Sequence, residues 1–193
     1  MIEKNTVALA IFTLLEDKDW TALTLNDVAA HLNISLEELH HFATSKEDLL
    51  ALMISYIEEQ TLKHINQDLI TENTSKEDKL FDSLFARFEA ATPHKKAIAN
   101  LKNTFQGNPT LAFNTIPQFI EAVKRLAALS DSHFTGPLGA LQLRGFALIY
   151  LRLIYIWLED DSPDMAKTMA ATNKAVTKYI PCLFDPCKVA DLF

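Results

Sequence analysis

The side chains of this sequence that could carry out chemistry are few and widely spaced. Two adjacent histidines, His40 and His41, and two cysteines, Cys182 and Cys187, are its closest pairs of metal-binding residues. Adjacent residues of a helix point to different sides, so the histidines cannot bind one metal ion together. No histidine or third cysteine lies near the cysteine pair to complete a zinc site, so ordinary reduced thiols are expected there.

Four acids gather ahead of the last predicted helix: Glu159, Asp160, Asp161 and Asp164. They could hold a divalent cation, but the sequence favours a solvated turn that starts a helix. Ser162-Pro163-Asp164 supplies a hydroxyl cap, a proline for the first turn and an acid at the positive end of the helix dipole. The chain also has no glycine-rich phosphate loop, nucleophile elbow or HExxH motif. The sequence therefore predicts a protein that is not an enzyme and needs no metal or cofactor.

The composition is that of a soluble helical protein. Of the 193 residues, 49% are hydrophobic and 22% charged, with only 4 glycines and 7 prolines to interrupt long helices. The N-terminal residues MIEKNTVALAIF lack the features of a secretory signal. The most apolar stretch, residues 146–158, contains Arg152 and is too short to span a bilayer. We therefore expect a cytoplasmic protein without a membrane span.

The negative charge is concentrated at the N-terminal end. Residues 1–50 contain three lysines and nine acids, which gives them a net charge of −6 out of −7 for the whole chain. Any partner of this segment meets an acidic surface.

The first 50 residues have the pattern of a helix-turn-helix. An apolar helix is expected over residues 4–16, and a second short helix follows Thr24. Asn33 tolerates the left-handed backbone of the tight turn that comes next. Ser35 and Glu38 have the spacing of a capping box, which opens a brief helix over residues 36–42. Ser45 and Asp48 repeat this spacing at the start of a longer helix.

Further helices are expected behind this segment. Their ranges are 76–91, 95–105, 111–129 with Pro117 at a kink or at the true start, 138–158 and 164–180. The helix over residues 138–158 is apolar on nearly every side, so we expect it to be packed all round. The last helix carries alanines and methionines, which suit close packing against another helix.

Residues 23–50, LTLNDVAAHLNISLEELHHFATSKEDLL, resemble without a gap the N-terminal signature of the TetR family of transcriptional regulators. The residues that match it are Thr24, Asp27, Val28, Ala29, Ile34, Ser35, Leu39, His41, Ser45, Lys46, Glu47, Leu49 and Leu50. The resemblance implies an all-α fold of about nine helices. In such a fold, a three-helix helix-turn-helix domain occupies residues 1–50. A C-terminal antiparallel helical bundle, residues 51–193, binds the ligand and dimerises.

The resemblance also implies the partners: operator DNA, a small apolar or amphipathic ligand, and a second subunit bound through residues 138–158 and 164–180. The residues expected at the DNA are Thr24, Ser35, Leu36, Glu37, Glu38, His40, His41, Thr44 and Lys46. Lys46 is either a phosphate contact or an exposed lysine. The residues expected at the ligand are Phe105, Phe113, Arg144, Tyr150 and Arg152. The two arginines either bind a ligand anion, pair with an acid such as Glu121, or extend outward to solvent.

The sequence departs from the family pattern where DNA is bound. Leu36 replaces the usual basic residue and is followed by two glutamates, while His40 replaces a tyrosine and Ala43 a phenylalanine. Lys4 is the only basic residue before the first helix ends. Duplex DNA attracts proteins chiefly by phosphate neutralisation, so these departures predict weak electrostatic attraction.

A second interpretation stays open. Residues 155–176, YIWLEDDSPDMAKTMAATNKAV, resemble the corresponding region of the TetR-shaped lipid-binding protein of ubiquinone biosynthesis, chiefly through DSPD. This likeness implies a lipid- or isoprenoid-binding protein that has lost DNA binding.

Overall fold

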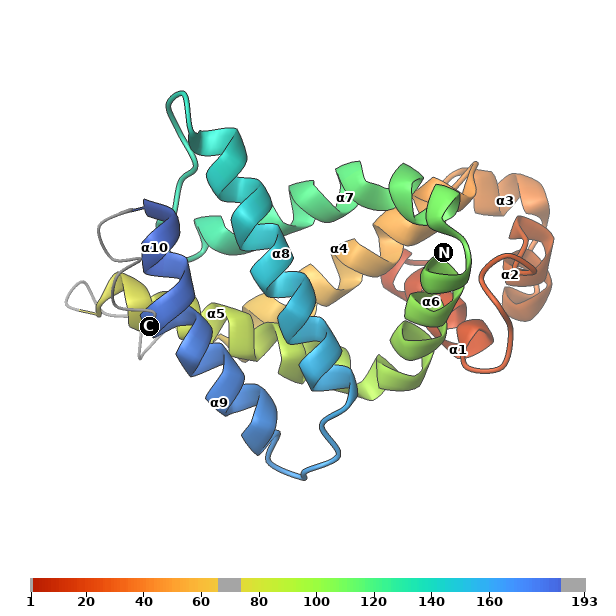
Figure 1. Ribbon diagram of the computed structural model, residues 1–193. Coiled ribbons are helices and arrows are strands. Elements are labelled where there is room, and N and C mark those ends of the chain that lie inside the picture. The colour runs from red at the N-terminus through yellow and green to blue at the C-terminus, as the bar shows by residue number, and fades with distance from the viewer. Residues whose placement is uncertain (1, 66–73, 185–193) are drawn as a thin grey trace. The chain divides into compact units, whose positions relative to one another are not determined.

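The computed structural model describes residues 2–65 and 74–184, so Cys187 lies outside the described residues. The helices, labelled in Figure 1, are α1 (Lys4–Leu15), α2 (Leu25–Leu32), α3 (Leu36–His40), α4 (Lys46–His64), α5 (Lys76–Ala91), the 3-10 turn η1 (Thr92–His94), α6 (Lys95–Gly107), α7 (Pro109–Ala128), α8 (Gly139–Leu158), α9 (Ala166–Lys174), the π-helical turn η2 (Ala175–Tyr179) and α10 (Ile180–Phe184). Within the described ranges there is no strand, and the all-α prediction is confirmed.

The chain divides into two compact units. The first comprises residues 1–60 and 91–118, and the second comprises residues 61–90 and 119–193. This division by compactness differs from the functional division at residue 50 that the sequence predicts, because α6 packs with the N-terminal helices. The functional division stays a prediction.

Helix α6 is fastened to the end of α1 by three residues spaced four apart. The ammonium of Lys96 lies 2.9 Å from Asp17 Oδ1. The Asn100 amide donates to the backbone carbonyls of Leu15 and Glu16, at 2.9 and 3.0 Å. Thr104 Oγ1 donates to Asp19 Oδ2 at 3.0 Å. Residues i, i+4 and i+8 lie on one helix face, so a single side of α6 satisfies the free carbonyls at the end of α1.

The core of the second unit is aromatic. The rings of Phe88, Phe119, Tyr150 and Trp157 form successive contacts with centroids 5.8–6.0 Å apart. Helices α9 and α10 pack on α8, and at Gly145 an added Cβ would lie 2.7 Å from a methyl group of Leu183. The absence of a side chain at Gly145 therefore lets α10 come close to α8.

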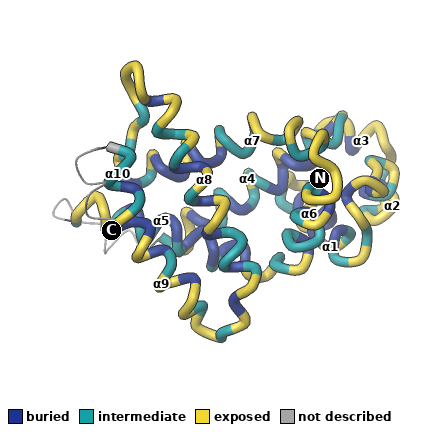
Figure 2. The backbone as a smooth tube through the Cα atoms, in the orientation of Figure 1, coloured by how far each residue is buried: buried dark blue, intermediate teal, exposed yellow. Residues whose placement is uncertain are grey.

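Only one side of α8 is covered, so the prediction of a helix packed all round is wrong for the single chain. Leu141 and Leu148 are 67% and 68% exposed, while Phe146 and Trp157 are buried. Figure 2 shows exposed and buried segments alternating along this helix. The hydrophobic residues of α8 thus serve two faces, one in the core and one open.

The last predicted helix starts later and is interrupted. Met165 has a left-handed backbone with φ 50°, so the chain is still turning at residues 162–165 and α9 begins at Ala166. Ser162 Oγ accepts a hydrogen bond from the amide of Ala166, so this serine caps the helix from a position further back than expected. The π-helical turn η2 then separates α9 from α10.

Candidate nucleic-acid interface

Helices α2 and α3 form a helix-turn-helix in which each helix has its own cap. Thr24 and Asp27 make a reciprocal capping box at the start of α2, and Ser35 and Glu38 make the predicted one at the start of α3. Between the two helices, Asn33 has φ 58°, the left-handed conformation predicted for it. These local contacts fix the turn and the direction in which α3 leaves it.

Helix α3 exposes all but one of its five side chains. Leu39 is fully buried and anchors the helix in the core. The exposed side chains are those of Leu36, Glu37, Glu38 and His40 on the helix, and of His41 directly after it. In a helix-turn-helix this second helix enters the major groove, so these are the side chains available to base edges.

Three of the residues expected at the DNA have hydroxyl groups that already donate to carboxylates. Thr24 Oγ1 donates to Asp27 Oδ2 at 2.6 Å, and Ser35 Oγ donates to Glu38 Oε2 at 3.1 Å. Thr44 Oγ1 likewise donates to Asp48 Oδ2 at 2.8 Å. A hydroxyl has a single hydrogen to donate. A phosphate contact from any of these three residues would therefore require it to leave its carboxylate.

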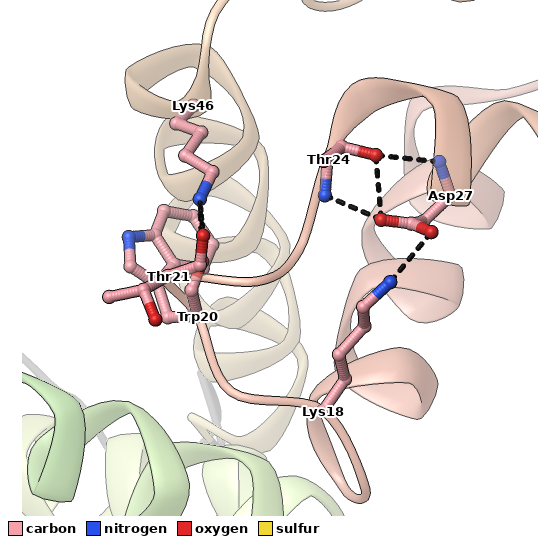
Figure 3. Close-up of polar contacts among 6 residues, drawn as sticks. All are labelled: Lys18, Trp20, Thr21, Thr24, Asp27 and Lys46. Carbon is pink, nitrogen blue, oxygen red and sulfur yellow. Dashed lines mark hydrogen bonds and ion pairs between the residues drawn. The ribbon is translucent and has the colours of Figure 1, made fainter.

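Lys46 faces the protein and is not a simple exposed lysine. Its ammonium donates to the carbonyl oxygens of Trp20 and Thr21, at 2.7 and 2.8 Å, and lies 5.7 Å from the centre of the Trp20 ring. Figure 3 shows the side chain reaching down from α4 to the loop between α1 and α2. Burial lowers the pKa of this ammonium, opposed by nearby acids of which Asp19 is the strongest.

The remaining lysines of the segment add little positive charge. Lys18 Nζ lies 2.6 Å from Asp27 Oδ1, the carboxylate that also caps α2 (Figure 3). The hydrogen bond from Lys18 and those from Thr24 lower the pKa of Asp27 to about 2. Among the three lysines of residues 2–50, only Lys4 has no hydrogen bond or ion pair to a carboxylate or carbonyl.

The carboxylates of the caps are held in their charged form. Hydrogen bonds from Ser35 lower the pKa of Glu38, and hydrogen bonds from Thr44 and Ser45 lower that of Asp48. Hydrogen bonds to the charged form of an acid stabilise that form. The surface around α2 and α3 therefore stays acidic at neutral pH.

The residues predicted to bind a ligand do not share one environment. Phe105 is half-buried and Phe113 is 72% exposed, both in the first unit. In the second unit, Tyr150 belongs to the aromatic core, while Arg144 and Arg152 are exposed on α8. Neither arginine pairs with Glu121, whose described ion-pair partner is Lys124, 3.9 Å away. The outward orientation, one of the alternatives left open, is therefore the one observed.

A small pocket lies elsewhere, in the first unit. It has a volume of about 180 Å³ and is lined by Glu3, Lys4, Asn5, Leu52, Ser55, Tyr56 and Glu59. None of the five predicted ligand residues lines it.

Two solved structures share the arrangement of helices described above. A TetR transcriptional regulator from Nitrosomonas europaea superposes with a TM-score of 0.68 at 15% identity, over 90% of this chain and 95% of that one. A TetR variant from Acinetobacter baumannii, in complex with minocycline, superposes with a TM-score of 0.56 at 18% identity, over 97% of this chain and 99% of that one. This chain has the TetR fold. No protein-family model and no curated protein matches the sequence.

The TetR fold gives the hydrophobicity of α8 an explanation other than a bilayer. By length and composition alone this helix, the one such helix among the described residues, could cross a membrane. The sequence predicts an apolar stretch at residues 146–158 that is too short to span a bilayer. The helix that contains this stretch is 20 residues long, so length does not exclude a membrane span. Its buried side packs in the helical core, and its open side carries Arg144 and Arg152.

Two features of the site were missed by reasoning from sequence. The box of Thr24 and Asp27 has aspartate where the usual pattern has glutamate, although the spacing could have revealed it. The pentapeptide TSKED also occurs twice, at residues 44–48 and 74–78, and opens α4 and α5. In the second copy Ser75 Oγ accepts from the amide of Asp78 at 3.0 Å, as Ser45 does from Asp48 at 3.1 Å.

Proposed function

We propose that the protein is a cytoplasmic, non-enzymatic transcriptional regulator of the TetR type. It binds operator DNA as a homodimer through α2 and α3, and a small apolar or amphipathic ligand releases it. The observation that carries the proposal is the exposed recognition helix α3, held in a helix-turn-helix by two capping boxes and anchored by buried Leu39. The TetR fold supports the proposal, and the minocycline complex shows that the A. baumannii protein of this fold binds a small molecule.

The open face of α8 supports the homodimer. Leu141, Leu148 and Leu151 on α8 and Met169 on α9 are exposed by 67%, 68%, 39% and 43%. Large apolar side chains exposed on one side of a helix, here together with Arg144 and Arg152, are typical of a protein–protein interface. A second copy that presents the same face across a twofold axis would cover the exposed apolar side chains of both subunits.

The charges of the helix-turn-helix predict an unusual dependence on salt. The free energy of DNA binding normally depends on counterions released at each neutralised phosphate, with a slope of log K against log salt of about −0.9 per contact. If Lys4 is the cation that each subunit offers, the slope for a dimer is about −2. Specific contacts to base edges then supply most of the affinity.

A second function is favoured by the occupied donors. Carboxylates accept the hydroxyl hydrogens of Thr24, Ser35 and Thr44. The ammonium group of Lys46 likewise donates to backbone carbonyls. A TetR-shaped lipid- or isoprenoid-binding protein that does not bind DNA needs none of these donors. The DSPD turn, residues 161–164, does not decide between the two functions. Its Ser162 donates to Asp160, the residue before the motif, and accepts from the amide of Ala166, so it has a structural role.

Selection of fragments from the genome of origin by the purified protein, at low salt, tests the proposal. We expect enrichment of a palindrome, lost in the variant His40→Ala/His41→Ala and retained in Glu47→Gln, which changes an exposed acid outside α3. If nothing is enriched, and mass spectrometry of the native protein finds a bound acyl or isoprenoid chain, the second function replaces the first. Glu37→Lys should raise nonspecific DNA affinity and leave the capping box of α3 intact, whereas Glu38→Lys would remove the carboxylate half of that box.

A further inference from the structure

The two glutamates of α3 differ in what they are free to bind. Glu38 Oε2 accepts hydrogen bonds from the amide and the hydroxyl of Ser35, at 2.9 and 3.1 Å, which commits it to the cap. Glu37 is exposed and, within the part of the chain that the structure describes, makes no hydrogen bond or ion pair. Glu37 is therefore the one carboxylate of α3 that a ligand can engage without loss of the helix cap.

Glu37 lies between the two histidines on the exposed face of α3. His40 and His41 follow it by three and four positions, so each is a neighbour of Glu37 although the two point to different sides of it. Both histidines are exposed, and Leu36 beside them is 37% exposed. This face presents one acceptor-only group, two imidazoles and an apolar side chain, and it has no lysine or arginine.

An acceptor-only side chain discriminates strongly among base edges in the major groove. The cytosine edge offers an amino group as donor, whereas the guanine edge offers two acceptors and the thymine edge an acceptor and a methyl group. A carboxylate is repelled by acceptors and binds the cytosine amino group. Adenine offers an amino donor, but its N7 acceptor lies next to it.

We infer that Glu37 reads a cytosine in each half-site of the operator, an inference that rests on the proposed DNA-binding function. The carboxylate accepts a hydrogen bond from the cytosine N4 amino group and excludes guanine and thymine at that position. A wrong base pair at one position of a specific site typically lowers affinity by about 5- to 150-fold. The same negative charge that weakens attraction to phosphate thus supplies sequence selectivity.

Selection from a randomised duplex library with the full-length protein tests this inference. The wild-type motif should hold one cytosine per half-site whose replacement by guanine lowers affinity about 5- to 150-fold. In Glu37→Gln the carboxylate becomes an amide, which pairs best with adenine, so the preference at that position should change from cytosine to adenine. The control Glu47→Gln removes an exposed acid from the first turn of α4 and should leave the motif unchanged.

The outcomes separate the inference from the function on which it rests. A motif that is identical in wild type and Glu37→Gln, or that contains no cytosine in the half-site, overturns the inference and leaves the regulator proposal standing. A wild-type protein that enriches no sequence at low salt overturns the regulator proposal, and the inference with it.

Discussion

The ammonium of Lys46 lies 2.7 Å from the carbonyl oxygen of Trp20, and this contact holds the loop before α2 against the first turn of α4. The pentapeptide around Lys46 recurs at residues 74–78, where Lys76 is exposed and has no partner among the described residues. Identical local sequence therefore places one lysine in a structural contact and the other in solvent. The difference arises from what each helix start packs against.

Replacement of Lys46 by methionine should destabilise the protein. Methionine keeps an apolar stem near the Trp20 ring but leaves the part-buried carbonyl of Trp20 without its donor, which costs about 2 kcal/mol of unfolding free energy. Lys76→Met changes the same residue in the same pentapeptide and should have almost no effect. Urea denaturation of the two variants measures the difference. Equal unfolding midpoints would show that the Lys46 contact is not structural.

These two lysines also mark the limit of reasoning from sequence. The capping box of Ser35 and Glu38 and the left-handed turn at Asn33 depend on residues within three or four positions, so the pattern alone predicts them. The contact of Lys46 with Trp20 joins residues 26 positions apart, and Asn100 reaches Leu15 across 85. Such contacts depend on how helices pack, which periodicity does not encode.

Acid should weaken the first unit through His94. Its ring stacks on Phe12 with centroids 4.1 Å apart and meets the edge of Tyr56 at 5.4 Å. Burial lowers the pKa of His94, although the charge of Glu16 opposes the shift. Above about pH 6.5 the His94 ring is neutral in both the folded and the unfolded protein. Below that pH the unfolded chain takes up a proton more readily than the folded one, so the free energy of unfolding decreases as the pH decreases.

The variant His94→Phe tests this dependence, because phenylalanine keeps the stacking but cannot be protonated. Its urea midpoint should fall less than that of the wild type between pH 7.5 and pH 5.5. His133→Gln, which changes an exposed histidine, should retain the wild-type response. A wild-type midpoint that stays constant over this range would contradict the prediction.

The turn between α8 and α9 should depend on one carboxylate. Burial alone would raise the pKa of Asp160, but hydrogen bonds from Ser162 and Thr168 hold it well below its usual value. In Asp160→Asn one carboxylate oxygen is replaced by an NH2 group, which cannot accept the hydrogen bonds that Ser162 and Thr168 donate. This variant should therefore lose about 2 kcal/mol of stability at pH 7. The contribution of a carboxyl with a lowered pKa is present above about pH 4 and is lost as the pH falls further.

Thermal unfolding of Asp160→Asn and of the neighbouring control Glu159→Gln, at pH 7 and pH 3, measures this contribution. We expect the difference in melting temperature between Asp160→Asn and the wild type to be smaller at pH 3 than at pH 7. Glu159→Gln should have the melting temperature of the wild type at both pH values. An unchanged difference would mean that the shape of the side chain matters and its charge does not.

The difference between predicted and observed packing of α8 leads to the last prediction. A pattern of hydrophobic residues cannot tell a face buried in the subunit from a face buried against a second copy, because water is excluded from both. Sedimentation at micromolar concentration should show a wild-type dimer. Leu148→Arg adds a third cation between the exposed Arg144 and Arg152, so like charges repel across the interface and the variant should be a monomer of unchanged helicity. Phe113→Arg alters a similarly exposed apolar residue of the first unit and should remain dimeric. A Leu148→Arg variant that stays dimeric would assign the interface to another surface and leave the open face of α8 for a different partner.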